Sequence, residues 1–168
     1  MSNYVTEALG RALLDLMQEK SIEKITADEL TTRAKVGRAT YFRNFNAKEE
    51  IITQSIVMRW RAYEKAHRLK EHRIDDPYRV RRYFEFCLSM RTENDVIMRQ
   101  NRSAAILSAY EIIFYDYDEP MARDTFERAY MAYGLFGVLL KWAKEGYRQT
   151  SANMTTMFLA LHGQNGRF

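Results

Sequence analysis

Residues 25–52 read ITADELTTRAKVGRATYFRNFNAKEEII, and this stretch decides the fold. Two short helical patterns are joined by a break at residues 35–37. Thr26, followed three residues later by Glu29, forms a capping box, in which the hydroxyl accepts from the Glu29 amide and the carboxylate reaches back. The pattern predicts one helix over 27–34 and a second over 38–45.

The flanking segments are also helical in pattern. Upstream, Leu9, Leu13, Leu16 and Met17 recur at helical spacing, which predicts an amphipathic helix over 4–19. Downstream, Asn46 is a second cap residue, and nothing breaks the helix before residue 77. A connecting helix of roughly 25 residues and ~40 Å is therefore expected within the segment 47–76.

The remainder predicts further helices over 78–92, 94–101, 103–117, 121–146 and 152–162, with Gly146 as a left-handed stop. No strand pattern is present, so the predicted fold class is all-α. The expected organisation is an N-terminal three-helix domain at 1–46, the connecting helix at 47–76, and a second helical domain at 77–168.

Composition narrows the class of protein. The single cysteine, Cys87, excludes an intrachain disulfide framework and favours a reducing compartment. No secretory signal pattern opens the chain. The longest nearly uncharged run, 129–143, is too short to span a bilayer and contains Lys141. We expect a soluble cytoplasmic protein.

The charge distribution is uneven around the break at 35–37. No acid lies between residues 33 and 48, a segment that contains five basic residues: Arg33, Lys35, Arg38, Arg43 and Lys48. Such clustering is typical of a surface that faces phosphates. The alternative is an ordinary solvated face.

Two short helices joined by three residues and backed by a third are the geometry of a helix-turn-helix, whose second helix enters the DNA major groove. On that helix, Phe42 and Phe45 are expected to face Leu30 and the first helix. Tyr41 and Asn44 are expected at the boundary. The outward residues are Arg38, Ala39, Thr40 and Arg43.

The quoted stretch resembles the N-terminal domain of the tetracycline-repressor (TetR/AcrR) family of transcriptional regulators. The matching features are the cap at Thr26, the turn at 34–36, the pair Tyr41-Phe42, and Lys48 followed by acids. The resemblance implies DNA contacts from Thr26, Thr40, Tyr41, Phe42, Arg43, Asn44 and Lys48, and the outward positions of Arg38 and Ala39 add these two residues. Thr26 and Lys48 would bind phosphates.

Three positions depart from the family pattern. Lys35 stands where the family usually has Gly, which requires a left-handed lysine or a different turn. Phe42 stands where Tyr is frequent, and Asn44 replaces the usual His.

Residues 130–143 read YMAYGLFGVLLKWA, apolar on nearly every face, so burial on nearly every face is expected. A homodimer built from this helix and the last one would provide it, as the resemblance also implies. The predicted interface residues are Tyr130, Gly134, Leu135, Gly137, Val138, Trp142, Met154, Met157, Phe158 and Leu161. The alternative is that both helices complete a monomer core.

Aromatic and Met side chains between these regions suggest a small-molecule effector pocket, which the resemblance implies for the middle helices. The pocket residues are Phe84, Cys87, Tyr110 and Phe114. The alternative is that they are core side chains.

No catalytic, cofactor or metal pattern is found. His67 and His72 lack metal-protease spacing, so an enzyme is not expected. The predicted function is a homodimeric regulator that binds a palindromic operator on double-stranded DNA and is released by a small molecule. The alternative is a TetR-like interaction module that acts through a protein partner without operator binding.

Overall fold

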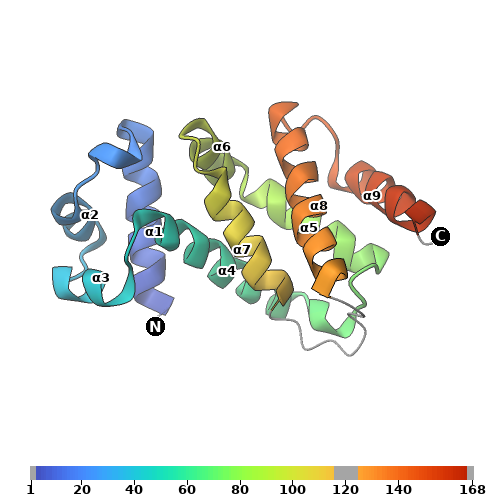
Figure 1. Cartoon of the computed structure of the whole chain (residues 1–168), viewed down its shortest axis with the longest axis horizontal. Helices are drawn as coiled ribbons and strands as arrows, with labels where there is room; N and C mark the ends of the chain where they lie inside the picture. Colours follow the sequence, from blue (N-terminus) through green and yellow to red (C-terminus); the bar gives the residue numbers. More distant parts are fainter. Residues whose placement is uncertain (1–2, 116–124, 166–168) are drawn as a thin grey trace.

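The computed structural model describes residues 3–115 and 125–165 (Figure 1). Its regular elements over these residues are all helical, so the predicted all-α class is confirmed for the described part of the chain. Two short 3-10 turns, η1 (Ile22–Lys24) and η2 (Leu69–Glu71), accompany the α-helices. The α-helices are α1 (Asn3–Glu19), α2 (Ala27–Ala34), α3 (Arg38–Asn44), α4 (Lys48–Ala66), α5 (Pro77–Ser89), α6 (Arg91–Arg99), α7 (Ser103–Tyr115), α8 (Thr125–Lys144) and α9 (Ser151–Asn165).

The connecting helix is shorter than predicted. It ends at Ala66 because Arg68 adopts a left-handed conformation with φ of 53°, which an α-helix cannot continue. The side chain of Asp76 then accepts from the Tyr78 amide at 2.8 Å and caps α5, with Pro77 in its first turn. A break therefore lies within 47–76, where the sequence predicted continuous helix.

The other boundaries follow the sequence more closely. Gly146 has φ of 72°, as expected of the residue that stops α8. The helix predicted over 94–101 begins earlier, at Arg91, and ends at Arg99. The predicted end at 117 and start at 121 lie outside the described residues.

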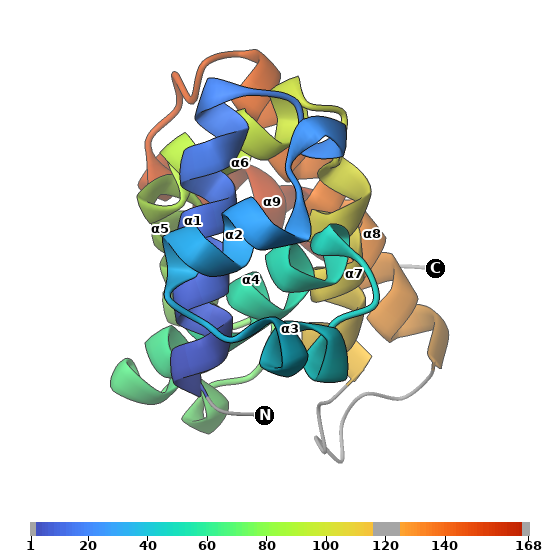
Figure 2. The same cartoon turned by 90° about the vertical axis from the view of Figure 1, so that its left-hand side faces the viewer.

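Helices α1, α2 and α3 form a head at one end of the molecule (Figures 1 and 2). Its core contains Leu9, Leu13 and Leu16 from α1 and Leu30 from α2, all without exposed surface. Burial of each such side chain contributes roughly 1.5–3 kcal/mol. Helix α4 leaves the head and runs into the body, which comprises α5 to α9.

Helix α1 crosses α4 at very short range. A Cβ atom added to Gly10 would lie 2.1 Å from Ser55 Oγ and 3.0 Å from Ser55 Cβ, so Ser55 would have to shift to make room for it. Ser55 Oγ also donates to the Thr6 carbonyl at 3.4 Å. The absence of a side chain at Gly10 is therefore what allows the head to pack directly on α4.

The body packs as pairs of helices: α7 lies against α4 and α8, and α9 lies against α5. A buried polar contact joins α5, α7 and α8. The Tyr83 hydroxyl lies 2.8 Å from that of Tyr110 and 3.3 Å from the Leu135 carbonyl, and Cys87 Sγ lies 3.6 Å from the Tyr110 hydroxyl. Burial raises the pKa of the Cys87 thiol to about 11.

The residues predicted to line an effector pocket are core side chains. Phe84, Cys87, Tyr110 and Phe114 are all buried, with at most 7% of any side chain exposed. The space beside Phe114 measures about 20 Å³, far below the roughly 300–1,000 Å³ typical of sites for small organic molecules. These four side chains therefore pack within the core of the single chain, and an effector pocket formed by them stays a prediction.

The predicted dimer residues divide into two groups. Leu135, Trp142, Met154 and Phe158 are buried within the single chain, where Phe84 contacts both the Trp142 and Phe158 rings. These four were wrongly assigned to an interface, because one chain already buries them. Partly or largely exposed are Tyr130, Gly134, Gly137, Val138, Met157 and Leu161.

Candidate nucleic-acid interface

The cap of α2 forms largely as predicted. The Thr26 hydroxyl accepts from the Glu29 amide at 3.2 Å. The Glu29 carboxylate does not reach back; it binds the Lys20 ammonium at 2.6 Å. This contact holds the pKa of Glu29 below its ordinary value. The capping box is therefore half formed, and α2 is also tied to the end of α1.

The turn between α2 and α3 is built on a left-handed lysine. Lys35 has φ of 54° and ψ of 40°, and the Val36 amide donates to the Thr31 carbonyl at 3.0 Å. These are the features of a Schellman stop, which usually has Gly at the left-handed position. The turn thus keeps its geometry despite the lysine, at the strain cost of a left-handed residue with a Cβ.

Helix α3 is rotated relative to the prediction. Tyr41 and Phe45 face inward, with 6% and 2% of their side chains exposed, and their rings stack with centroids 6.4 Å apart. Phe42, predicted to face the core, is 56% exposed. Burial raises the pKa of Tyr41. The buried pair is spaced i, i+4, where the sequence interpretation chose i, i+3.

Helix α3 lies at the extremity of the head, at the end of the molecule opposite α9 (Figure 1). Arg38, Ala39, Phe42 and Arg43 are exposed, and Thr40 and Asn44 are partly exposed. The Asn44 amide donates to the Thr40 carbonyl at 2.6 Å, which orients its carbonyl oxygen. Of the residues predicted on this helix to contact DNA, Tyr41 alone is buried.

Several cations of the basic segment are engaged within the protein. Arg33 binds Glu19 at 3.1 Å, and Arg38 pairs with Asp28. The Arg38 guanidinium also lies 5.5 Å from the centre of the Phe42 ring. Arg43, by contrast, makes no ion pair with any residue in the described ranges, and its side chain is exposed.

Lys48 has a structural role that the sequence interpretation missed. Its ammonium donates to the Ile25 carbonyl at 2.9 Å and to the Ile22 carbonyl. It therefore stabilises the η1 turn between α1 and α2. The assignment of Lys48 as a phosphate ligand is corrected, since its ammonium is already bound to two backbone carbonyls of this turn.

A second clamp on the same turn comes from the body. Gln100, which follows α6, accepts from the Ile22 amide at 2.7 Å and donates to the carbonyls of Lys20, at 2.9 Å, and Met17. Nothing in the sequence distinguishes this glutamine, because its partners lie about eighty positions earlier. The role of Gln100 comes from its position in the fold together with a side-chain amide that both donates and accepts.

Other kinds of site find little support. Within residues 3–115 and 125–165, no group of three or more His, Cys, Asp or Glu side chains is arranged to hold a metal ion. No helix in these ranges has the length and apolar character needed to cross a membrane. The outward face of α3 remains the candidate interface.

Comparison with known proteins adds no assignment. No model of a known protein family matches the chain, and no curated protein matches it.

Proposed function

We propose that the chain is a DNA-binding transcriptional regulator that binds a palindromic operator as a homodimer and is released by a small molecule. The observation that carries the proposal is the outward face of α3. It projects from the end of the head, bears Arg43 without an internal ion pair, and presents apolar Ala39 and Phe42 beside polar Thr40.

This mixture suits direct reading of DNA in the major groove. Arg43 can donate to a guanine edge or to a phosphate, and Ala39 and Phe42 can contact thymine methyl groups. Thr40 can donate to either base edges or backbone. Helix α2 packs against α3 in the head, as the proposal requires of the two helices of a helix-turn-helix.

The dimer in this proposal uses the surface of α8 and α9. Met157 and Leu161 on α9 have 52% and 58% of their side chains exposed, and Tyr130 on α8 has 48%. A Cβ placed at Gly134 or Gly137 would meet nothing within 4 Å, so a second helix can approach there. Two heads related by a dimer axis would read half-sites ~34–36 Å apart.

A second function has one observation in its favour. Arg33, Arg38 and Lys48 are bound within the protein, while the Phe42 ring is largely exposed. An exposed aromatic ring beside arginine is also typical of a protein-binding surface. The second candidate is therefore an interaction module whose α3 face binds a protein partner.

Titration of DNA tests the first proposal. Fluorescence anisotropy with DNA from the region upstream of the encoding gene should give saturable binding. A plot of log affinity against log salt concentration should have a slope of about −0.9 for each phosphate that the protein neutralises. Arg43→Ala should weaken binding by ~1–3 kcal/mol. Lys144→Ala, on the exposed end of α8, is the matched control and should bind as wild type. A binding affinity that does not change with salt concentration would refute the proposal.

Sedimentation tests the dimer separately. Met157→Glu places a charge on the proposed interface without disturbing the core, since the residue is exposed in the single chain. Wild type should sediment as a dimer and the variant as a folded monomer. A dimer that persists in Met157→Glu would place the interface elsewhere.

A further inference from the structure

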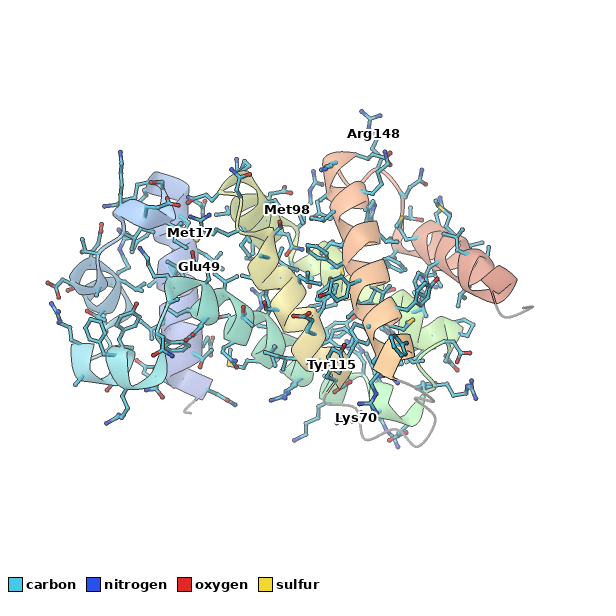
Figure 3. All side chains as sticks on the ribbon, viewed as in Figure 1. Met17, Glu49, Lys70, Met98, Tyr115 and Arg148 are labelled. Atoms are coloured by element: carbon cyan, nitrogen blue, oxygen red, sulfur yellow. The ribbon has the colours of Figure 1, made fainter. Side chains whose placement is uncertain are left out.

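A pocket lies at the far end of α4, where this helix, η2 and α7 meet. Its volume is about 440 Å³, and its lining includes Trp60 and Glu64 from α4, Lys70 from η2 and Ile113 from α7. Figure 3 shows Lys70 at the lower edge of the molecule, near the end of α7 marked by Tyr115. Volumes of roughly 300–1,000 Å³ are typical of sites for small organic molecules.

Two polar atoms of this pocket are buried without a well-formed hydrogen bond. Trp60 Nε1 and Glu64 Oε1 lie near each other but make no hydrogen bond of normal length and angle within the described ranges, and their residues are 6% and 5% exposed. They are four residues apart on α4 and so lie on the same face of the helix. A buried donor and a buried acceptor that meet at poor geometry are both incompletely satisfied, and a hydroxyl group between them would complete both.

The Trp60 ring is held in place by its neighbours. It makes edge contacts with Tyr83 and Phe86, with ring centroids 6.1 Å and 5.1 Å apart. The indole N–H is therefore fixed in direction before any ligand arrives. Such preorganisation reduces the entropy lost on binding.

Charge is arranged around the buried carboxyl. Burial raises the pKa of Glu64, and the positive charges of Lys70 and Arg79, together with the nearby Trp60 N–H, oppose that effect. The outer lining is mainly basic, with Arg61, Lys65 and Lys70 exposed. The interior of the pocket thus offers a donor and an acceptor, and its outer part offers positive charge.

We propose that this pocket binds a small aromatic acid that carries a hydroxyl group. One hydroxyl can accept from Trp60 Nε1 and donate to Glu64 Oε1, which completes both buried atoms. The flat apolar part of the ligand contacts Trp60 and Ile113, and its acid group faces the basic outer lining at Lys65. The claim that this ligand is the effector that releases DNA rests on the proposed function. The claim that it binds to the pocket does not.

Nuclear magnetic resonance of the full chain tests the binding. The chain has two tryptophans, and the indole of Trp142 already donates to the Gln149 carbonyl at 3.1 Å. Titration with 4-hydroxybenzoate should shift the Trp60 indole resonance saturably and leave that of Trp142 in place. Benzoate, without the hydroxyl, and 4-methylphenol, without the acid, should each bind more weakly. No saturable shift with any of the three probes up to their solubility limits overturns the proposal.

Calorimetry of variants tests the contacts. Trp60→Phe keeps an aromatic ring and removes the N–H, so affinity for 4-hydroxybenzoate should fall roughly tenfold. Lys65→Met keeps the length of the stem and removes the charge, so affinity should fall roughly two- to fivefold. Lys144→Met, an exposed lysine outside the pocket, is the control for a lost charge. Equal affinity in all three variants and wild type would show that the ligand binds elsewhere.

The two proposals fail in different ways. If 4-hydroxybenzoate binds at Trp60 but the protein binds no DNA, the pocket stands and the regulator proposal falls. If the protein binds its operator with a normal salt dependence but the Trp60 resonance never moves, the pocket proposal falls alone.

Discussion

Replacing Gln100 by alanine should destabilise the protein by about 3 kcal/mol. The Gln100 side chain makes three hydrogen bonds to backbone groups, at Met17, Lys20 and Ile22. The Met17 and Lys20 carbonyls lie at or just past the end of α1, where no later helical amide reaches them. Each lost bond costs about 1 kcal/mol, so the sum is ~3 kcal/mol. Urea unfolding followed by circular dichroism measures this difference.

Hydrogen exchange at individual backbone amides distinguishes the loss of the Gln100 hydrogen bonds from a general loss of packing. In Gln100→Ala, the Ile22 amide loses its acceptor and should exchange with solvent faster relative to amides of α5 and α9. Arg99→Ala is the matched control, because Arg99 is exposed and reaches only the Asp95 carbonyl of its own helix; its effect should stay within about 0.5 kcal/mol. A Gln100→Ala protein as stable as the Arg99→Ala control would refute the clamp.

Three other outcomes are expected. Tyr41→Ala should lower stability by roughly 3–5 kcal/mol, whereas Phe42→Ala should leave unfolding within about 1 kcal/mol of wild type and weaken DNA binding; the reverse would restore the original assignment of faces. Glu64 has a raised folded-state pKa, so the native state holds more protons and stability is lost as pH rises through that pKa; Glu64→Gln should flatten this loss in urea titrations across acidic pH. Cys87, buried with a pKa of about 11, should resist iodoacetamide at neutral pH until the protein unfolds.

Much of the fold follows from local pattern. The amphipathic spacing of α1, the cap at Thr26 and the left-handed Gly146 each specify structure through nearby residues, and each was predicted from the sequence. The end of α4 could not be predicted in this way. Arg68 takes a left-handed conformation that its residue type does not favour, so no local signal marks the break.

The candidate site was predicted less completely than the fold. Measured from Phe45, Tyr41 lies about 40° around the helix and Phe42 about 60°, so periodicity alone left both pairs possible. Packing in the core of the head favours the pair with the smaller angular separation, Tyr41 and Phe45. The role of Lys48 was missed for a different reason: a lysine ahead of two acids reads as surface charge, and its carbonyl partners lie more than twenty positions earlier.

The close crossing at Gly10 has a practical consequence for protein engineering. A chimaera that joined a foreign DNA-binding module to this body at residue 46 would cut between α1 and the part of α4 on which it rests. The donor module would bring its own first helix, and any side chain at the position of Gly10 would collide with Ser55. The exchangeable cassette should therefore extend through Ser55, with the splice placed in the following turn of α4. Grafts made there would carry both surfaces of the crossing together and keep the native register between module and body.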